Sequence, residues 1–589
     1  MKTFTFVRRT LFTVLVLISA SFSVNPNSPE WTAFVHVNVI PMDQEQVLPD
    51  QTVVIHHDRI QAIGPAASTA VPPAARVIDA KGQYLLPGLA DMHVHIYFPE
   101  ELTLYVVNGV TTVFNLNGQP AHLNWRKQTA SGELLGPAIY SVGPTFDHSR
   151  TAEEAVKEVD AQAAAGYDGI KIYNQVSGAE YSELTAEAHK KNMVLVGHIA
   201  REPGFAATLA AGQSIAHAEE YLYTFFNNDP DPKHDLTHHL DPAKIPQGVA
   251  LTRRAGISVI ATLVAYHNIV RQLTELDDYL HNPDLQYLAP VMQMQLQPVE
   301  NGYVQRIAKE AIPHMPVNYE FQKRLVMALH EGGVPILAGT DSAGQGLGVP
   351  GFSLLEEIEN FQEIGFTPYA ALKTATTDAS ALLRQSDEFG TVTVGKRADL
   401  LLVSNNPLDD INNLHGIVGV MARGRWIPDT ERRILLSQVP DTYRQTTARL
   451  IQQVKTDPKQ VDQYLEMNDP FGEQAFAVLN SLGGGKEFRD ALIGLMKTDS
   501  NSPLVAESTV NKIGYELLAQ KKNDSALEVF QLNTELYPKS GNACDSLAET
   551  YIALGKKDLA KQYYQKALEV QPDYPNAKAA REILEKQLK

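Results

Sequence analysis

Between residues 84 and 389 short apolar segments alternate with amphipathic ones, and this alternation constrains the fold more than any other feature. Eight apolar runs are candidate strands: 88–95, 109–115, 137–143, 169–173, 193–198, 213–219, 257–264 and 335–341. Helical segments such as 151–166 and 179–192 separate most of them. Apolar strands that alternate with helices are typical of a parallel sheet, and eight such units predict an α/β fold, a (β/α)8 TIM-like barrel. A doubly wound open sheet is the structural alternative.

Two sets of shorter alternating runs flank this region. The first set begins in residues 31–83 with FVHVNVIPM, QTVVIHHDRIQAIG and ARVIDAKGQYLLPG, the last of which continues to Gly88, and a similar pattern returns in 390–430. Such runs, separated by turn residues, are typical of small antiparallel strands. They predict one small β-sandwich formed from both flanks, with the barrel of residues 84–389 inserted between its halves.

The C-terminal region contains a repeat. Ala526 and Ala560, and likewise Pro538 and Pro572, stand 34 residues apart. A 34-residue period with small residues and a terminal proline at fixed positions is the tetratricopeptide signature. We expect an all-α region with tetratricopeptide-like repeats in 508–589, preceded by a helical linker region in 431–507. These few repeats could pack on the parent chain, bind a protein partner or support self-association.

Composition narrows the function classes. The 50 Lys and Arg against 68 Asp and Glu give a net charge of −18, and an acidic surface repels phosphate backbones, so we expect no nucleic-acid partner. Cys544 is the only cysteine, which excludes an intramolecular disulfide framework and a cysteine zinc cage. Any bound metal must therefore be held by histidines and carboxylates.

The N-terminus has the pattern of an export signal. Lys2, Arg8 and Arg9 precede an apolar stretch at 10–22, and small and polar residues follow. This stretch is too short to cross a hydrocarbon core of about 30 Å, so we expect a signal peptide at 1–23 that is removed, with no stable membrane anchor left. The mature protein would be periplasmic or secreted. The route, general or twin-arginine, stays open.

His93 and His95 close the first barrel strand. Residues i and i+2 of a strand point to the same face, so both imidazoles can reach one metal ion. Their place at the carboxyl end of the strand matters more than the short motif, because barrel active sites lie at that end.

Four further strands offer a ligand-type side chain at or near the same end: Lys171, His198, His217 and Asp341. Taken singly, each has an ordinary structural explanation, as a core histidine, a loop cap or a lysine that reaches solvent. Taken together with the histidine pair, they favour a metal centre at the mouth of the barrel.

The chain resembles the metal-dependent amidohydrolase superfamily, in the branch related to imidazolonepropionase and Xaa-Pro dipeptidases. The resemblance covers roughly residues 31–430 and rests on the stretches PGLADMHVH, NGVTTVFN, GYDGIKIY, NMVLVGH, AGQSIAH, PILAGTDS and FGTVTVGKRADLLLVSNNPLDDI. It implies that His93 and His95 bind a first metal ion, with Asp341 as ligand and general base. It places His198 and His217 at a second ion, and Lys171 at the lysine that carries a CO2-derived carbamate and bridges both ions.

The implied function is an exported hydrolase of amide-type C–N bonds, with a dipeptide, an N-acyl amino acid or a cyclic amide as substrate. The implied cofactors are two divalent ions of the Zn²⁺ type and a metal-bridging hydroxide. One alternative is a mononuclear imidazolonepropionase or deaminase-like enzyme, in which one ion suffices and Lys171 is unmodified. Another is a non-catalytic scaffold that acts through its repeats. The family commonly ends its second strand in Val-Arg-Asp, whereas this chain has Val113-Phe114-Asn115, so the substrate does not transfer safely between subfamilies.

Substrate-binding candidates follow the third, fourth and seventh strands, where side chains should face the barrel mouth: His148, Tyr173, Tyr266 and His267. The long segment 218–334 carries another group of histidines, which we interpret as part of a solvated loop: His234, His238 and His239.

Overall fold

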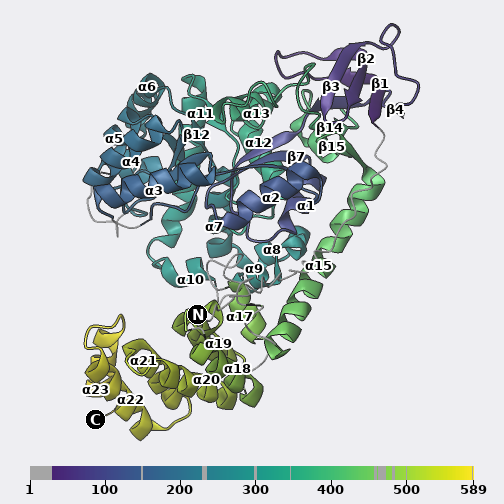
Figure 1. The fold of residues 1–589 in the computed structure, drawn as a ribbon. Coiled ribbons are helices and arrows are strands. Elements are labelled where there is room, and N and C mark those ends of the chain that lie inside the picture. Colours follow the sequence, from purple (N-terminus) through teal and green to yellow (C-terminus); the bar gives the residue numbers. More distant parts are fainter. Residues whose placement is uncertain are drawn as a thin grey trace, which may run out of the picture.

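The computed structural model describes residues 30–147, 150–227, 235–296, 301–344, 346–456, 461, 473–480, 485–498, 500–586 and 588. The expected signal peptide, His148 and His234 lie outside these residues. Figure 1 shows a barrel and its flanking sheet joined by one long helix, α15 (Asp429–Thr456), to a group of C-terminal helices.

All eight expected barrel strands are present. They are β6 (Leu89–Val94), β7 (Val110–Asn115), β8 (Ala138–Ser141), β9 (Gly169–Ile172), β10 (Val194–Gly197), β11 (Ser214–Ala216), β12 (Val259–Ile260) and β13 (Ile336–Leu337). Neighbours pair in parallel in the orders β6-β7-β8 and β9-β10-β11-β12-β13. Parallel bridges Val142↔Gly169 and Val94↔Ser342 join the two sheets at both ends, so the barrel closes. The barrel prediction is confirmed, and the open sheet is excluded.

Helices cover the outside of the barrel. They are α1 (Glu101–Val107), α2 (Pro120–Ser131), α3 (Ala152–Ala165), α4 (Gly178–Lys190), α5 (Gly204–Ala210), α6 (Ile245–Ala255), α11 (Met315–Glu331), α12 (Phe352–Glu363), α13 (Pro368–Thr374) and α14 (Thr377–Leu382). Local sequence sets their ends. For α3, Thr151 and Glu154 form a capping box, and Gly166 ends the helix at φ 93°, a left-handed conformation that glycine adopts without strain.

The segment between β12 and β13 is the largest addition to the barrel. It contains α7 (Leu263–Thr274), α8 (Leu276–Leu280), α9 (Pro290–Gln295) and α10 (Gly302–Arg306). The amino end of α7 is fixed by Glu357 of α12, whose carboxylate accepts hydrogen bonds from the backbone of Leu263 (3.0 Å) and Val264 (2.7 Å). This contact positions the residues that follow β12 at the barrel mouth.

The flanking strands form one continuous sheet. They are β1 (Trp31–Val39), β2 (Leu48–His56), β3 (Arg59–Pro65), β4 (Arg76–Asp79), β5 (Tyr84–Pro87), β14 (Leu400–Val403), β15 (Ile417–Ala422) and β16 (Arg425–Pro428). The order is β16-β15-β14-β5-β1-β2-β3, with β4 paired to β1. The two flanks therefore join by hydrogen bonds between β14 and β5, not only by packing as in a sandwich of separate sheets. Register shifts bend β1, and the sheet curls until the rings of Phe34 and Trp426 lie 5.0 Å apart.

The C-terminal helices have a core of their own. They are α17 (Glu473–Asn480), α18 (Gly485–Thr498), α19 (Glu507–Ala519), α20 (Asn523–Leu536), α21 (Gly541–Ala553), α22 (Lys557–Val570) and α23 (Ala577–Lys586). The period-34 pairs Ala526 with Ala560, and Phe530 with Tyr564, are all buried in it. No helix among the described residues combines the length and apolar character that crossing a membrane requires.

Helix α15 connects these helices to the barrel mouth. Its Tyr443 is buried against Phe98, with ring centroids 5.8 Å apart, and its Thr446 donates a hydrogen bond of 3.0 Å to Glu100. Phe98 and Glu100 belong to the segment after β6, the strand that contains His93 and ends just before His95. The C-terminal part of the chain therefore packs on a loop of the candidate site.

Candidate active site

The first ligand group brings together both ends of the barrel sequence. The Nε2 atoms of His93 and His95 lie 3.2 Å and 2.8 Å from one oxygen, Oδ1 of Asp341. His95 also donates a backbone hydrogen bond of 2.6 Å to Ser342, which ties the end of β6 to the residue after Asp341. Two imidazole nitrogens and one carboxylate oxygen, all within 4.8 Å of one another, form a donor set suited to a divalent metal ion.

The second pair of histidines lies beside the first. The ring of His217 is 4.5 Å from that of His93 and 4.8 Å from that of His198. Nδ1 of His198 lies 2.7 Å from Glu220, and Nδ1 of His217 lies 2.8 Å from the hydroxyl of Thr262. Such contacts orient an imidazole and leave its Nε2 as the nitrogen available to a ligand.

Lys171 lies inside the same cluster. Its side chain is 1% exposed, and its Nζ is 3.4 Å from Nε2 of His93. Burial lowers the pKa of Lys171 to about 8, so roughly a tenth of the amine is uncharged at pH 7, far more than for an ordinary lysine. An uncharged amine is the form that reacts with CO2.

The protonation states of the cluster match those of metal ligands. Burial lowers the pKa of His93 to about 3 and also lowers the pKa values of His198 and His217. The neighbouring His93 and His95 hold the pKa of Asp341 well below its ordinary value, against the opposing effect of burial. Neutral imidazoles and an ionised carboxylate are the forms that bind metal, so these residues fit one or two divalent ions.

Three adjacent strand ends depart from extended backbone at the site. His217, Thr262 and Asp341, which follow β11, β12 and β13, have φ values of 75°, 50° and 56°. Non-glycine residues rarely adopt this left-handed region, and such strain clusters at functional sites. The buried carboxylate of Asp91 supports this geometry from below, because it accepts hydrogen bonds from the hydroxyl (2.7 Å) and backbone (3.1 Å) of Thr340.

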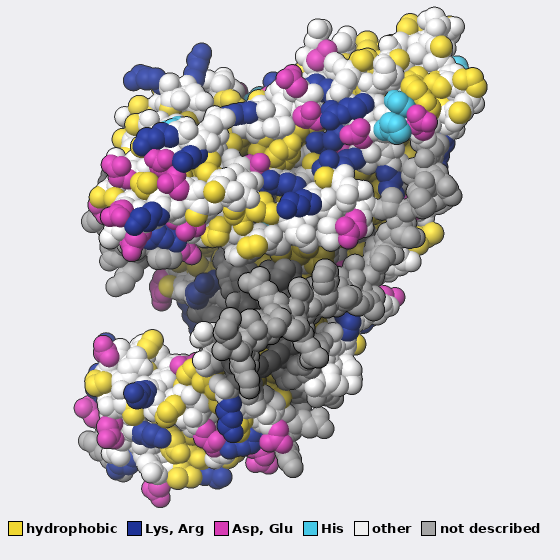
Figure 2. All heavy atoms as spheres, viewed as in Figure 1, with side chains coloured by type: hydrophobic (Ala, Val, Ile, Leu, Met, Phe, Trp, Pro, Cys, Tyr) yellow, Lys and Arg dark blue, Asp and Glu magenta, His cyan; other side chains and the backbone are white. Residues whose placement is uncertain are grey.

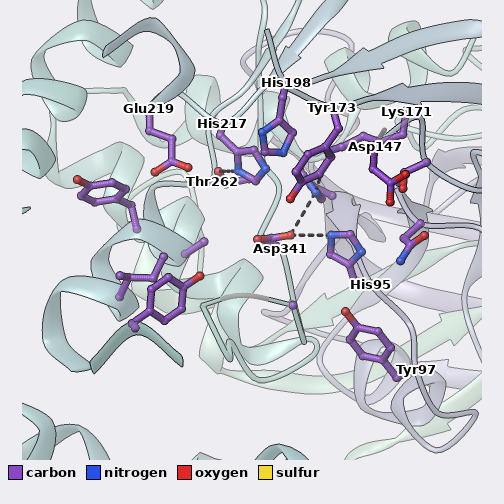
Figure 3. A pocket seen from close by; sticks show the side chains of 18 of the residues that line it. His95, Tyr97, Asp147, Lys171, Tyr173, His198, His217, Glu219, Thr262 and Asp341 are labelled. Carbon is purple, nitrogen blue, oxygen red and sulfur yellow. Dashed lines mark hydrogen bonds and ion pairs between the residues drawn. The ribbon is translucent and has the colours of Figure 1, made fainter. Parts of the chain in front are cut away.

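A cavity of about 770 Å³ opens above the cluster. Two of the substrate-binding candidates, Tyr173 and Tyr266, line it (Figure 3 labels Tyr173). His267 does not line the cavity, and its ring stacks on Tyr319 of α11 with centroids 4.9 Å apart. His238 and His239 are also absent from the cavity lining.

The structure adds site residues that the sequence reasoning missed. Glu219 lines the cavity, Glu220 holds His198, and Thr262 holds His217. The adjacent carboxylates two and three residues after a ligand histidine were a visible signal. Thr262 carries no such signal, because a threonine at a strand end is ordinary.

Asn115 occupies the position where the family commonly has aspartate. Its side chain accepts a hydrogen bond from the backbone of Ile96 (3.1 Å) and donates one to the hydroxyl of Ser141 (3.1 Å). Asn115 therefore ties the loop after β6 to β8 as a neutral group.

Comparisons with known proteins agree with this geometry. The model of the amidohydrolase family matches residues 84–427, and the tetratricopeptide repeat model matches residues 541–574. An adenine deaminase from Paracoccus denitrificans (strain Pd 1222) is 22% identical over 410 residues, which cover 66% of this chain and 56% of the relative. An imidazolonepropionase from Arthrobacter sp. (strain FB24) is 45% identical over 150 residues, 24% of this chain and 34% of that protein.

Among solved structures, a protein from Bifidobacterium longum proposed to be a prolidase aligns with a TM-score of 0.52 at 25% identity. The alignment covers 70% of this chain and 99% of that one. The chain spans about half the length of the adenine deaminases that it matches.

Proposed function

Because the chain belongs to the amidohydrolase family, we propose that it is a metal-dependent hydrolase of amide-type C–N bonds. One observation carries the proposal: ligand-type side chains from five barrel strands converge on one buried cluster beneath a cavity of about 770 Å³. Their protonation states and mutual distances suit metal ions, and the cavity has the size of a small-molecule site.

In this proposal His93, His95 and Asp341 hold one divalent ion, and His198 and His217 hold a second. Bound divalent ions lower the pKa of a water molecule and polarise a carbonyl group. Asp341 is ionised, so it can accept the proton of the attacking water and return it to the departing nitrogen. Tyr173 stacks on His198 with ring centroids 4.0 Å apart and limits the space above the second histidine pair.

The chemical state of Lys171 distinguishes a site with two metal ions from a site with one. Its uncharged amine can form an N–C bond with CO2 and release a proton, which yields a carbamate anion able to bridge two cations. The burial of Lys171 beside His93 supports this assignment. In the mononuclear alternative, Lys171 stays an amine and only one of the two ligand groups is filled.

The test is hydrolysis by the metal-loaded chain. Matched dipeptides, N-acyl amino acids and cyclic amides would be offered to zinc-loaded, chelator-treated and Asp341→Asn protein. We expect release of amine from at least one class, with losses of roughly 100-fold or more after chelation or Asp341→Asn. If all three preparations are inactive and a repeat-binding protein is found, the scaffold alternative replaces the enzyme.

We propose two further properties, a role for the repeats and export. The repeats of α19 to α22 supply paired helices of the kind that mediate protein contacts. We propose that they bind either a protein partner or a second copy of this chain. The basic and apolar pattern of residues 1–23 supports the proposal that the protein is exported. Mass spectrometry of the mature amino terminus tests export, and light scattering tests self-association.

A further inference from the structure

Three ligand-type side chains meet in the flanking sheet, at the ends of β1 and β2 (Figure 1), and none of them lines the cavity of the barrel. Glu30 stands directly before β1, while His56 ends β2 and His57 begins the turn to β3. The antiparallel register pairs Trp31 with His56, and the backbone N–H of His57 donates to the carbonyl oxygen of Glu30 at 2.9 Å. Strand pairing therefore brings Glu30 beside both histidines.

The two histidine rings lie close together although they are neighbours in the chain. Adjacent residues of a regular strand point to opposite faces, but His57 has a left-handed φ of 53°, and its ring lies 4.3 Å from that of His56. Trp31 stacks on His56 with ring centroids 3.9 Å apart, which fixes the plane of that imidazole. The turn and the stacking thus preset the directions of both imidazoles.

The ligand atoms are spaced as they would be around a single metal ion. Oε1 of Glu30 lies 2.8 Å from Nε2 of His56 and 3.8 Å from Nε2 of His57. Zinc–ligand bonds of about 2.0–2.1 Å in tetrahedral geometry place neighbouring ligand atoms roughly 3.3–3.4 Å apart, between these two distances. Among the described residues, only two groups bring three such atoms within 4.8 Å of one another, and the other group is His93, His95 and Asp341.

The cluster is open to solvent, unlike the barrel centre. The side chains of Glu30 and His57 are 61% and 65% exposed, and that of His56 is 32% exposed. An ion can therefore enter from solvent and keep water as its remaining ligand. Two imidazoles with one carboxylate favour transition-metal ions such as Zn²⁺ over Mg²⁺ and Ca²⁺, which prefer oxygen ligands.

We infer that Glu30, His56 and His57 form a surface site for a divalent transition-metal ion of the Zn²⁺ type, separate from the barrel centre. The bound ion links the chain before β1 to the turn between β2 and β3. Because its ligands are exposed, this ion exchanges readily, and we expect desalting to remove it. The inference does not depend on the proposed hydrolase function.

Equilibrium dialysis of the full chain against Zn²⁺ tests the site. The wild type should bind one exchangeable ion at least roughly 10-fold more tightly than His57→Gln or Glu30→Gln, because losing even an indirect support of a metal site costs that much affinity. His36→Gln removes another exposed histidine of the same sheet, one that pairs with Asp50, and should bind Zn²⁺ like the wild type. Equal Zn²⁺ binding by the wild type, His57→Gln and Glu30→Gln would overturn the inference.

Hydrogen exchange locates the ion in the chain. With Zn²⁺ present, the backbone amides of residues 30–31 and 56–58 should exchange more slowly in the wild type, and His57→Gln should lose this protection. Mg²⁺ at the same concentration should give no protection, because it binds imidazole poorly. Equal protection by Mg²⁺ would indicate a general effect of charge, and Zn²⁺ protection confined to other segments would place the ion elsewhere. Either result would contradict the site.

Discussion

At the scale of single residues, the proposed function assigns its chemistry chiefly to Asp341 and Lys171. Asp341 contacts both histidines of the first pair through one oxygen, so it can hold an ion and still exchange a proton. Lys171 is buried among lone-pair donors, where an ammonium group would be poorly solvated. Both residues are therefore better explained by a bound cation than by packing.

Replacing Lys171 with alanine tests the bridging role. Lys171 is the one lysine among the described residues that line the cavity. If it carries the proposed carbamate, Lys171→Ala should lose roughly one of two bound ions and most of the hydrolytic activity together. Elemental analysis and turnover of the same preparation measure both. The exposed Lys127→Ala serves as control. A variant with unchanged metal content and unchanged turnover would exclude Lys171 as a ligand.

Glu220 has a different role, that of orienting His198. Because the Glu220 carboxylate lies 2.7 Å from Nδ1 of His198, Glu220→Gln should weaken binding of the second ion roughly 10- to 100-fold and leave the first ion in place. Competition with a fluorescent zinc chelator measures both affinities. Glu202→Gln, at an exposed position, should match the wild type. Loss of both ions in Glu220→Gln would instead indicate collapse of the site.

At the scale of elements, the sequence predicts which segments form barrel strands but not how long each strand is. Each predicted strand is present, but β12 and β13 pair over only two residues each. The left-handed φ values of His217, Thr262 and Asp341 end the ladder at the site. Apolar runs in the sequence indicate which segments become barrel strands. The left-handed backbone conformations that place the ligand side chains depend on contacts between strands, which the runs do not reveal.

The flanking sheet shows the same limit at longer range. Alternation predicts strands in 31–83 and 390–430, but it does not tell which edges pair. The hydrogen bonds between β5 and β14, more than 300 residues apart in the chain, make one curled sheet where the sequence predicts a sandwich. Among the site residues, six ligand candidates were predicted from strand ends, and Glu219 stands close to one of them in the sequence. Thr262 could be placed at the site only from the fold.

Glu357 links α12 to α7 and gives a pH-dependent prediction. Burial raises its pKa from 4.5 to about 8, so the folded chain keeps a proton that the unfolded chain releases near its ordinary value. Unfolding thus releases a proton between these values, and the contribution of Glu357 to stability falls as pH rises through that window. Glu357→Gln cannot ionise, so we expect the stability advantage of the wild type over Glu357→Gln to shrink from about pH 5 to about pH 8.

Calorimetric unfolding midpoints across this pH range measure the effect. At low pH the variant should be less stable, because it loses one of two backbone hydrogen bonds, at a cost of about 1–3 kcal/mol. Glu363→Gln, an exposed change on the same helix, should follow the wild-type profile. A wild-type advantage that grows with pH would show that Glu357 is ionised in the folded chain.

At the scale of the whole molecule, the C-terminal helices and the barrel mouth are coupled through α15. Figure 2 shows acidic and basic side chains interspersed over the visible barrel helices, so the net charge of −18 is not gathered in one patch on that face. The family comparison confirms the resemblance to amidohydrolases and the presence of a tetratricopeptide repeat.

Because Tyr443 and Thr446 of α15 hold a loop of the site, a cut near residue 440 would remove these contacts together with the repeats.

Tyr443→Ala tests this coupling in the full chain. Loss of the buried ring should cost about 3–5 kcal/mol and speed hydrogen exchange in the loop 95–100, which carries Tyr97 into the cavity. Leu450→Ala lies on the same helix but packs in the C-terminal core, so it should leave that loop unchanged. Equal exchange in the loop of wild type and Tyr443→Ala would show that α15 is only a tether.

The most direct test of the central claim is the number of metal ions bound per chain. The protein would be purified from zinc-supplemented, bicarbonate-containing medium and analysed by elemental mass spectrometry. We predict about two ions per chain, held by the two histidine pairs, Asp341 and carbamylated Lys171. About one ion would select the mononuclear alternative. A folded chain that binds none would contradict the assignment of this cluster as a metal centre.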